Sequence, residues 1–177
     1  MNNAKQELLN FCRDIGGHNI SDSTYYECAN FLFFTSWFEE VLFNDDNKQN
    51  PNNDIKIADD LSQKIDLSVF DFFGDYFSAR YIKNDITTNH LFNNLKLSTK
   101  NAVKVSKSLI DYMVSKQRDK NLLWSYIMIV YRFRNNMFHG SKGLINLNNY
   151  VDQFSIINKF MKLLLIEIIN KKYVGYN

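Results

Sequence analysis

The scarcity of helix-breaking residues constrains the fold of this 177-residue chain more than any other feature. The sequence contains one proline and six glycines, so few positions can interrupt a helix. Most of its long segments carry apolar residues at three- and four-residue spacing, which is the period of an amphipathic helix. The sequence therefore predicts an all-α fold, and its pattern does not require strands.

The length and composition predict a single domain. A chain of about 150 residues can hide roughly two thirds of its unfolded surface. Hydrophobic residues make up 45% of this chain, with 15 Phe and 10 Tyr, which is typical of a globular protein. We expect one helical domain over residues 1–177. The polar segment 44–54, which contains Pro51, is predicted to be a surface loop that is too short to divide domains.

Charge and cysteine usage restrict the function classes only weakly. The net charge of +2 does not indicate a polyanion-binding composition, so a nucleic-acid surface would need local clustering of cations. Cys12 and Cys28 form no CxxC pair, and the polar N-terminal residues do not resemble a signal peptide, so we expect a reducing cytoplasm. The longest apolar run, at 163–169, is interrupted by Glu167 and is too short to span a bilayer.

Five segments have the periodicity of long helices, and together they predict an up-and-down bundle of four to five main helices with short peripheral ones. These segments are residues 23–43, 68–83, 98–116, 119–138 and 148–172. The last is apolar almost all round between Phe160 and Ile169, so it either runs through the centre or also meets a second subunit.

The first of these helices is predicted to begin at the capping box formed by Thr24 and Glu27. The side chains expected to face the core from this helix are Phe31, Phe34, Trp37, Phe38, Val41 and Leu42. Two acids, Glu39 and Glu40, follow the aromatic run and could lie opposite a catalytic motif. Because the spacing of the aromatic residues around them indicates a helix face packed in the core, we leave both acids outside the candidate site.

The run from Arg134 to Gly140, with the sequence Arg-Asn-Asn-Met-Phe-His-Gly, gathers the most chemically active side chains. On a regular helix, Arg134 and His139 would lie about 140° apart. Gly140 is a natural residue just beyond a helix end, which places His139 in the last or exit turn, where helical periodicity no longer fixes its direction. The two side chains could therefore converge.

A histidine that titrates near neutrality can exchange protons, and an arginine offers a planar fork of donors for a phosphate. RNA carries its own nucleophile, the 2′-hydroxyl, so cleavage without metal needs a base, an acid and a cation. One histidine cannot easily be both acid and base, so the chemistry predicts a homodimer with two facing copies of the motif. The nearest acids in sequence, Asp119 and Asp152, are at least thirteen residues from His139, and we expect neither metal nor cofactor.

A structural interpretation of the same residues remains open. Arg134 would then be a surface cation, Asn135 and Asn136 exit-turn amides, and His139 with Gly140 an ordinary helix end. An arginine and a histidine separated by four residues often occur by chance, so the spacing alone decides nothing.

The longer string from Tyr131 to Lys142, Tyr-Arg-Phe-Arg-Asn-Asn-Met-Phe-His-Gly-Ser-Lys, resembles the HEPN superfamily. It is especially similar to the Arg-Asn-Asn-(Leu/Met)-Phe-His-Gly-x-Lys variant of Apea-like and related defence-associated HEPN proteins. The resemblance covers about residues 65–172 and implies a HEPN-like helical bundle. It also implies a metal-independent endoribonuclease, in which Arg134 and His139 of two protomers line a shared cleft and Asn135 helps to orient them.

The resemblance further implies a biological role and a competing one. Such domains are common in toxin-antitoxin, abortive-infection and other antiviral defence systems, where RNA cleavage halts growth and an antitoxin or another defence protein is the partner. Other HEPN proteins keep the fold without catalysis. The alternative is therefore a binding or assembly module that shapes a dimer groove for a partner protein or a nucleotide.

Several residues outside the Arg-His pair are candidates for contact with RNA phosphates. Asn136 and Lys142 flank His139, and a flexible ammonium at Lys142 could reach a substrate, although a surface-loop lysine is nearly as plausible. Lys100 and Lys104 belong to a predicted basic stripe on one helix face that also includes Lys96 and Lys107. Such a stripe is either an RNA-backbone track or simply a solvated face.

Overall fold

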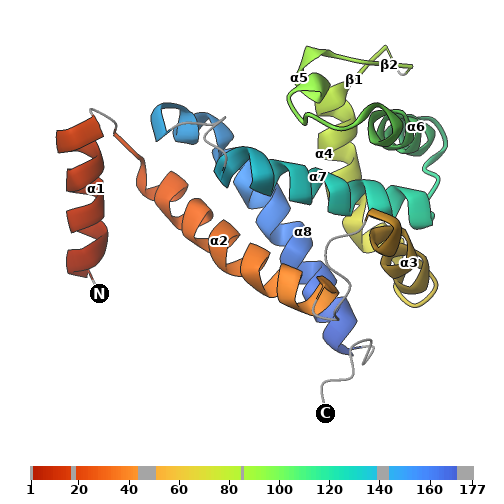
Figure 1. The fold of residues 1–177 in the computed structure, drawn as a ribbon, viewed down its shortest axis with the longest axis horizontal. Helices are drawn as coiled ribbons and strands as arrows, with labels where there is room; N and C mark the ends of the chain where they lie inside the picture. The colour runs from red at the N-terminus through yellow and green to blue at the C-terminus, as the bar shows by residue number, and fades with distance from the viewer. Residues whose placement is uncertain (1, 17–18, 44–50, 85, 139–143, 171–177) are drawn as a thin grey trace.

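The chain folds into an all-α structure, as the sequence predicts (Figure 1). The structure is a computed structural model that describes residues 2–16, 19–43, 51–84, 86–138 and 144–170. Within these ranges none of the helices is long and apolar enough to cross a membrane. The helices are α1 (Asn2–Gly16), α2 (Asp22–Phe43), α3 (Pro51–Ser62), α4 (Asp71–Tyr81), α5 (His90–Asn93), α6 (Thr99–Ser115), α7 (Lys120–Phe138) and α8 (Val151–Asn170), with 3-10 segments η1 (Leu67–Phe70) and η2 (Leu144–Tyr150).

Three predicted helices agree with α2, α6 and α7 to within one residue at each end. Side-chain caps explain this agreement. The Ser98 hydroxyl accepts from the backbone nitrogen of Asn101 at the start of α6, and Lys116 ends that helix in a left-handed conformation with φ 54°. At the start of α7, the Asp119 carboxylate accepts from the nitrogens of Asn121 and Leu122, each at 2.9 Å.

Other parts of the prediction need correction. Residues 51–54, assigned to a polar loop, form the first turn of α3, because proline is well tolerated at the first position of a helix. The helix predicted at 68–83 divides into η1 and α4, and the one predicted at 148–172 is α8 preceded by η2. Two very short strands, β1 (Ile82–Lys83) and β2 (Thr87–Thr88), pair antiparallel, although the sequence pattern gives no reason to expect strands.

The centre of the fold is the pair formed by α2 and α8, which lie side by side and run in the same direction (Figure 1). The ring centroids of Phe31 on α2 and Phe154 on α8 are 5.3 Å apart. Phe133 of α7, which crosses this pair, packs edge-on against both rings, at 5.6 Å and 5.2 Å. Hydrogen bonds from a buried amide also join α8 to α2. The Asn158 side chain donates to the Glu27 backbone oxygen at 2.9 Å and to the Glu27 carboxylate at 2.7 Å.

Helix α2 buries most of the face that the sequence predicts, with one exception. Phe31, Phe38, Val41 and Leu42 are buried and Phe34 is partly buried, whereas Trp37 remains 37% exposed. At about 100° per residue, Trp37 points roughly 120° away from Phe31, outside the arc that contacts the rest of the fold.

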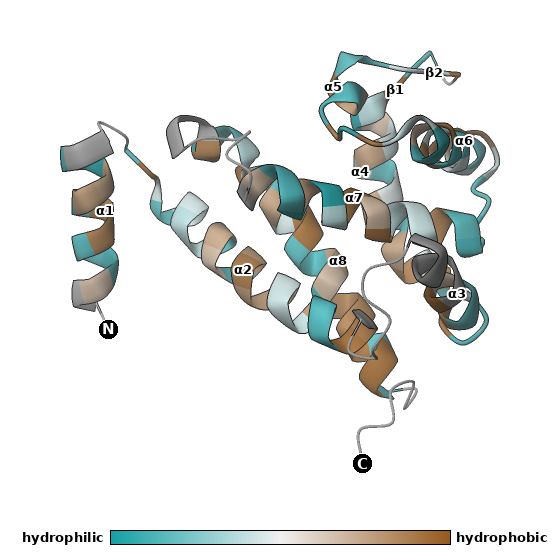
Figure 2. Cartoon of the chain, in the orientation of Figure 1, coloured by the Kyte–Doolittle hydropathy of each residue, from teal (hydrophilic) through white to brown (hydrophobic). Residues whose placement is uncertain are grey.

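Helix α8 runs through the centre, which is one of the two possibilities for its stretch 160–169, apolar almost all round. The C-terminal end of α8 is mostly brown in Figure 2. Phe160, Met161 and Leu164 are fully buried against neighbouring helices. Ile166 and Ile169 nevertheless remain 40% and 50% exposed, so part of the apolar surface is not covered within one chain.

Candidate functional site

The C-terminal half of α7 carries the described part of the Arg-His motif. Arg134 lies on the side of α7 that faces α2, where its Nε is 3.1 Å from Oε1 of Glu39. Its Nη2 donates to the other Glu39 oxygen at 3.5 Å, and its Nη1 donates to Oδ1 of Asn135 at 3.1 Å. Two neighbours therefore hold the guanidinium in a defined position, which is a requirement for a group that binds a phosphate.

The Arg134–Glu39 pair is only partly buried. The side chains of Arg134 and Glu39 are 29% and 26% exposed, so the pair is shielded from water yet accessible from one side. A phosphate that approached from solvent would meet the guanidinium together with a nearby carboxylate. Glu39 thus orients Arg134 and also competes with an anion for it.

Sequence reasoning left Glu39 out of the candidate site, and the structure brings it in. The aromatic run around Glu39 obscured its position on the helix. At about 100° per residue, Glu39 lies some 80° from Phe31, at the edge of the buried arc, while Glu40 lies on the opposite side and is exposed. An acid at the edge of an apolar helix face was the signal that could have identified it.

Two other members of the predicted site, His139 and Lys142, lie outside the described residues. The convergence of Arg134 with His139 therefore stays a prediction. What the structure does describe is the helix that leads to them, because α7 continues to Phe138, directly before His139.

Asn136 does not join Arg134 and Asn135. Two residues along a helix correspond to about 200°, so Asn136 faces away from Arg134 and into the fold. There it is buried, with 5% exposure, and its Nδ2 donates to the backbone oxygen of Asn94 at 2.8 Å. Arg132, one turn earlier on α7, donates through Nε to the oxygen of Leu95 at 2.8 Å. Asn136 and Arg132 together attach the segment after α5 to α7.

The predicted basic stripe is not one continuous face. Lys96 lies outside α6 in a left-handed conformation, and Lys107 forms an ion pair with Asp111 at 2.9 Å. Lys104 places its Nζ 4.1 Å from the ring centroid of Trp124, a cation–π contact, and burial lowers its pKa. Trp124 precedes Arg134 by ten residues, or about 15 Å along α7.

Lys100 is exposed in the first turn of α6. Of the two α6 lysines predicted to contact RNA, Lys100 is thus solvated and Lys104 packs on an aromatic ring. In the part of the chain that the structure describes, no contact brings either lysine to the Arg134 end of α7. A path for RNA that included both Arg134 and Lys104 would have to follow much of the length of α7.

No protein-family model, curated protein or solved structure matches the chain. Within the described ranges, no cluster of three or more His, Cys, Asp or Glu side chains is arranged to hold a metal ion. The arrangement of Arg134, Asn135 and Glu39 is therefore interpreted from its own chemistry.

Proposed function

We propose that the protein is a HEPN-type endoribonuclease that cleaves RNA without a metal ion through Arg134 and His139. The observation that carries the proposal is the fixed position of the Arg134 guanidinium between Glu39 and Asn135, with four residues between Arg134 and the motif histidine in sequence. A solvated surface arginine would need neither partner. The resemblance of residues 131–142 to HEPN ribonucleases supports the same function.

The proposed reaction is an internal transesterification. His139 removes the proton from a 2′-hydroxyl, and the resulting oxyanion attacks the adjacent phosphorus. Arg134 stabilises the negative charge that develops on the non-bridging oxygens, and Asn135 and Glu39 keep its fork aligned. The bond to the 5′-oxygen breaks, and that oxygen takes a proton from His139 of a second copy. The products are a 2′,3′-cyclic phosphate and a 5′-hydroxyl end.

The need for a second histidine makes a homodimer part of the proposal. An apolar surface that a second copy could cover lies on α2, where Tyr26, Phe33 and Trp37 are 55%, 64% and 37% exposed. Their spacing of seven and four residues places all three within about 40° on one helix face. At about 100° per residue this face points at least about 120° away from Glu39, so a composite site also needs contacts nearer to Arg134. Large apolar side chains that gather on one exposed face are typical of an interaction surface.

A cytoplasmic toxin or antiphage effector is the biological role that fits this activity. Unregulated RNA cleavage would stop growth, so a partner antitoxin or a defence trigger would have to restrain it. Expression of the wild-type chain is then expected to arrest growth, and expression of Arg134→Ala is expected to permit it.

The test is cleavage of a labelled RNA by the purified protein in excess EDTA. We expect wild type to produce 2′,3′-cyclic phosphate ends, and Arg134→Ala and His139→Ala to lose at least about 100-fold in rate. The matched controls are Arg13→Ala and His90→Ala, which alter exposed residues of the same types.

Two results would contradict the proposal. Equal cleavage by wild type and His139→Ala would show that the activity belongs to another site or to a contaminant. Binding of a partner protein or a nucleotide with no cleavage under any condition would instead favour the noncatalytic assembly module.

A further inference from the structure

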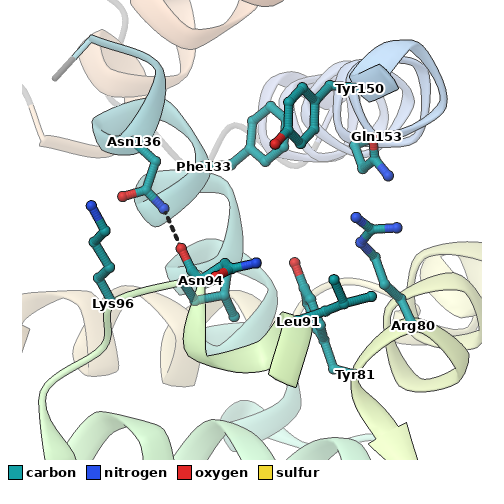
Figure 3. A pocket seen from close by; sticks show the side chains of 10 residues that line it. Arg80, Tyr81, Leu91, Asn94, Lys96, Phe133, Asn136, Tyr150 and Gln153 are labelled. Atoms are coloured by element: carbon teal, nitrogen blue, oxygen red, sulfur yellow. Dashed lines mark hydrogen bonds between the residues drawn. The ribbon is translucent and has the colours of Figure 1, made fainter. Parts of the chain in front are cut away.

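A cavity of about 260 Å³ opens between α4, α7, η2 and α8 (Figure 3). On α7 its lining includes Asn136, which lies about 200° around the helix from Arg134. The cavity is bounded by the end of α4, by α5 and the segment that follows, and by the start of α8. Its described lining includes Arg80, Tyr81, Lys96, Phe133, Tyr150 and Gln153. Among the described residues, two cations and no acidic side chain line the cavity.

One end of the cavity is formed by Arg80, whose charge has no carboxylate partner among the ion pairs of the described residues. In the amide orientation that satisfies all its neighbours, Gln153 accepts from Nη1 of Arg80 at 2.8 Å and from Nη2 at 3.1 Å. The same oxygen accepts from the Tyr76 hydroxyl at 3.1 Å. These partners hold the guanidinium in place and leave its charge uncompensated.

Two further groups define the electrostatics near Arg80. The Tyr81 side chain is 4% exposed and lies against Arg80, and burial raises its pKa, so its hydroxyl keeps the proton that it could donate to an anion. Burial raises the pKa of Tyr76, and the charge of nearby Asp152 adds to this increase. Asp152 itself is exposed and is not among the described residues that line the cavity. An anion in the cavity would therefore meet donors rather than acids.

The middle and the far end of the cavity differ in character. Leu91, Phe133 and Tyr150 provide apolar and aromatic surface in the middle (Figure 3). At the far end the Lys96 ammonium lies beside the Asn136 amide, across the cavity from Arg80 (Figure 3). The lining thus changes from cationic to apolar and back to cationic along its length.

The walls are fastened by hydrogen bonds rather than by apolar contact alone. Asn136 and Arg132 on α7 hold the backbone oxygens of Asn94 and Leu95, each at 2.8 Å. Asn89 donates to the Arg80 backbone oxygen at 2.7 Å and so fixes the end of α4. A site whose walls are set before binding loses little conformational entropy when a ligand enters.

We propose that this cavity binds a small organic dianion with a flat apolar body, with one anionic group on Arg80 and Tyr81 and the other on Lys96. The Arg80 guanidinium can donate to a phosphate ester through the N–H groups that Gln153 does not accept, and an aromatic ring can pack on the apolar surface of Leu91, Phe133 and Tyr150. Ligand sites for drug-sized molecules occupy about 300–1,000 Å³, so a cavity of about 260 Å³, just below that range, suits a smaller molecule with a single ring. The proposal does not depend on the ribonuclease activity.

The test compares two probes by isothermal titration calorimetry. Phenyl phosphate carries an anionic group at one end, and 4-carboxyphenyl phosphate carries one at each end. Wild type is expected to bind 4-carboxyphenyl phosphate about tenfold more tightly, because only this probe can reach both cations. Lys96→Gln should remove that preference, and Arg80→Lys should weaken both probes about tenfold through loss of the planar fork.

Two controls keep the result specific. Lys100→Gln removes an exposed lysine outside the cavity, and His139→Ala removes the proposed catalytic histidine. Both should bind the probes as wild type does, and thermal unfolding should show that the Arg80 and Lys96 variants remain folded. The proposal is overturned if wild type binds neither probe at millimolar concentration. It is equally overturned if folded Arg80→Lys and Lys96→Gln both bind the probes as wild type does.

Discussion

Arg134 on α7 and Glu39 on α2 form an ion pair across 95 positions of sequence, with Nε and Oε1 3.1 Å apart. The pair connects the helix that ends at the proposed catalytic motif to one of the two central helices. Because each side chain is about three quarters shielded, the contact is better protected from screening than an ordinary surface salt bridge. It makes Glu39 a positioning residue for the proposed reaction.

Replacement of Glu39 tests that role. Glu39→Gln keeps the size of the side chain but removes the charge that aligns Arg134, so RNA cleavage is expected to fall about 10- to 100-fold. The loss should appear mainly in kcat, because the guanidinium can still attract phosphate. Glu40→Gln, on the exposed side of α2, should cleave at the wild-type rate. An unchanged kcat in a folded Glu39→Gln protein would exclude the positioning role.

The exposed aromatic face of α2 predicts how the proposed dimer responds to charge. Phe33→Glu places a carboxylate on a side chain that is 64% exposed in the single chain, so folding of the protomer should be little affected. Burial of an unpaired charge in an interface is costly, so the dimer should dissociate. Sedimentation velocity and cleavage assays on the same samples measure both effects. We expect a monomer, and its cleavage rate then measures whether this contact is required for the composite site.

The matched control for this surface is Val103→Glu, which changes an exposed apolar residue of α6. It should sediment and cleave as wild type does. A Phe33→Glu protein that remains dimeric would place the interface elsewhere, and a monomeric variant with full activity would contradict the composite site.

Gly74 on α4 predicts a strong effect on stability. A Cβ at this position would lie 2.2 Å from Oη of Tyr126 and 2.7 Å from Cε1 of Tyr112, and both rings are buried. Gly74→Ala is therefore expected to lower the free energy of unfolding by about 1–3 kcal/mol, since neither ring can move without repacking the core. Chemical denaturation measures the difference.

A double substitution checks the cause of that loss. The Tyr126 hydroxyl is buried and has no hydrogen-bond partner within the described structure, so Tyr126→Phe should cost little on its own. Because it removes the atom nearest to the added methyl group, it should restore part of the stability of Gly74→Ala. Simple addition of the two effects would show that the Tyr126 hydroxyl is not the obstacle.

The contact between Asp71 and Arg118 predicts a dependence of stability on pH. Arg118 donates Nε to Oδ1 of Asp71 at 2.8 Å, and this hydrogen bond lowers the pKa of the carboxyl. A carboxyl whose pKa is lower in the folded state stabilises the fold above its unfolded value of about 3.9. That stabilisation is lost as the pH falls through the lower, folded value.

Arg118→Gln should consequently unfold at lower denaturant concentration than wild type at pH 7, and the difference should shrink below pH 4. Lys83→Gln, an exposed cation outside the described ion pairs, provides the comparison. A difference between Arg118→Gln and wild type that stays constant down to pH 2 would mean that the Asp71 charge is not its source.

Local sequence predicted the helices whose ends carry their own signals. Ser98 and Asp119 cap the backbone amides that follow them, so α6 and α7 begin where the sequence indicates. Segments without such signals were harder to assign. The sequence pattern around Pro51 predicts a loop, but Pro51 begins α3. The two-residue strands pair with each other, and the sequence around them shows no alternating pattern that predicts strands.

The candidate site divides in the same way. The position of Arg134 and Asn135 near the end of a helix can be predicted from the sequence, because helix periodicity and Gly140 are local features. The separation of Asn136 from Arg134 follows from that periodicity too, once α7 is known to remain regular through both residues. The contribution of Glu39 could not be derived, because it depends on how α2 and α7 cross.

The sequence by itself determined that the chain is helical and where its best-capped helices begin, and it predicted the Arg134–Asn135 part of the candidate site. Backbone hydrogen bonds in helices connect near neighbours, so local side chains suffice to specify them. Only the tertiary structure decided that Glu39 meets Arg134, that Trp37 stays exposed, and that Arg80 and Lys96 share a cavity. These relationships depend on the angles at which helices pack, and those angles are set by side chains from every part of the core.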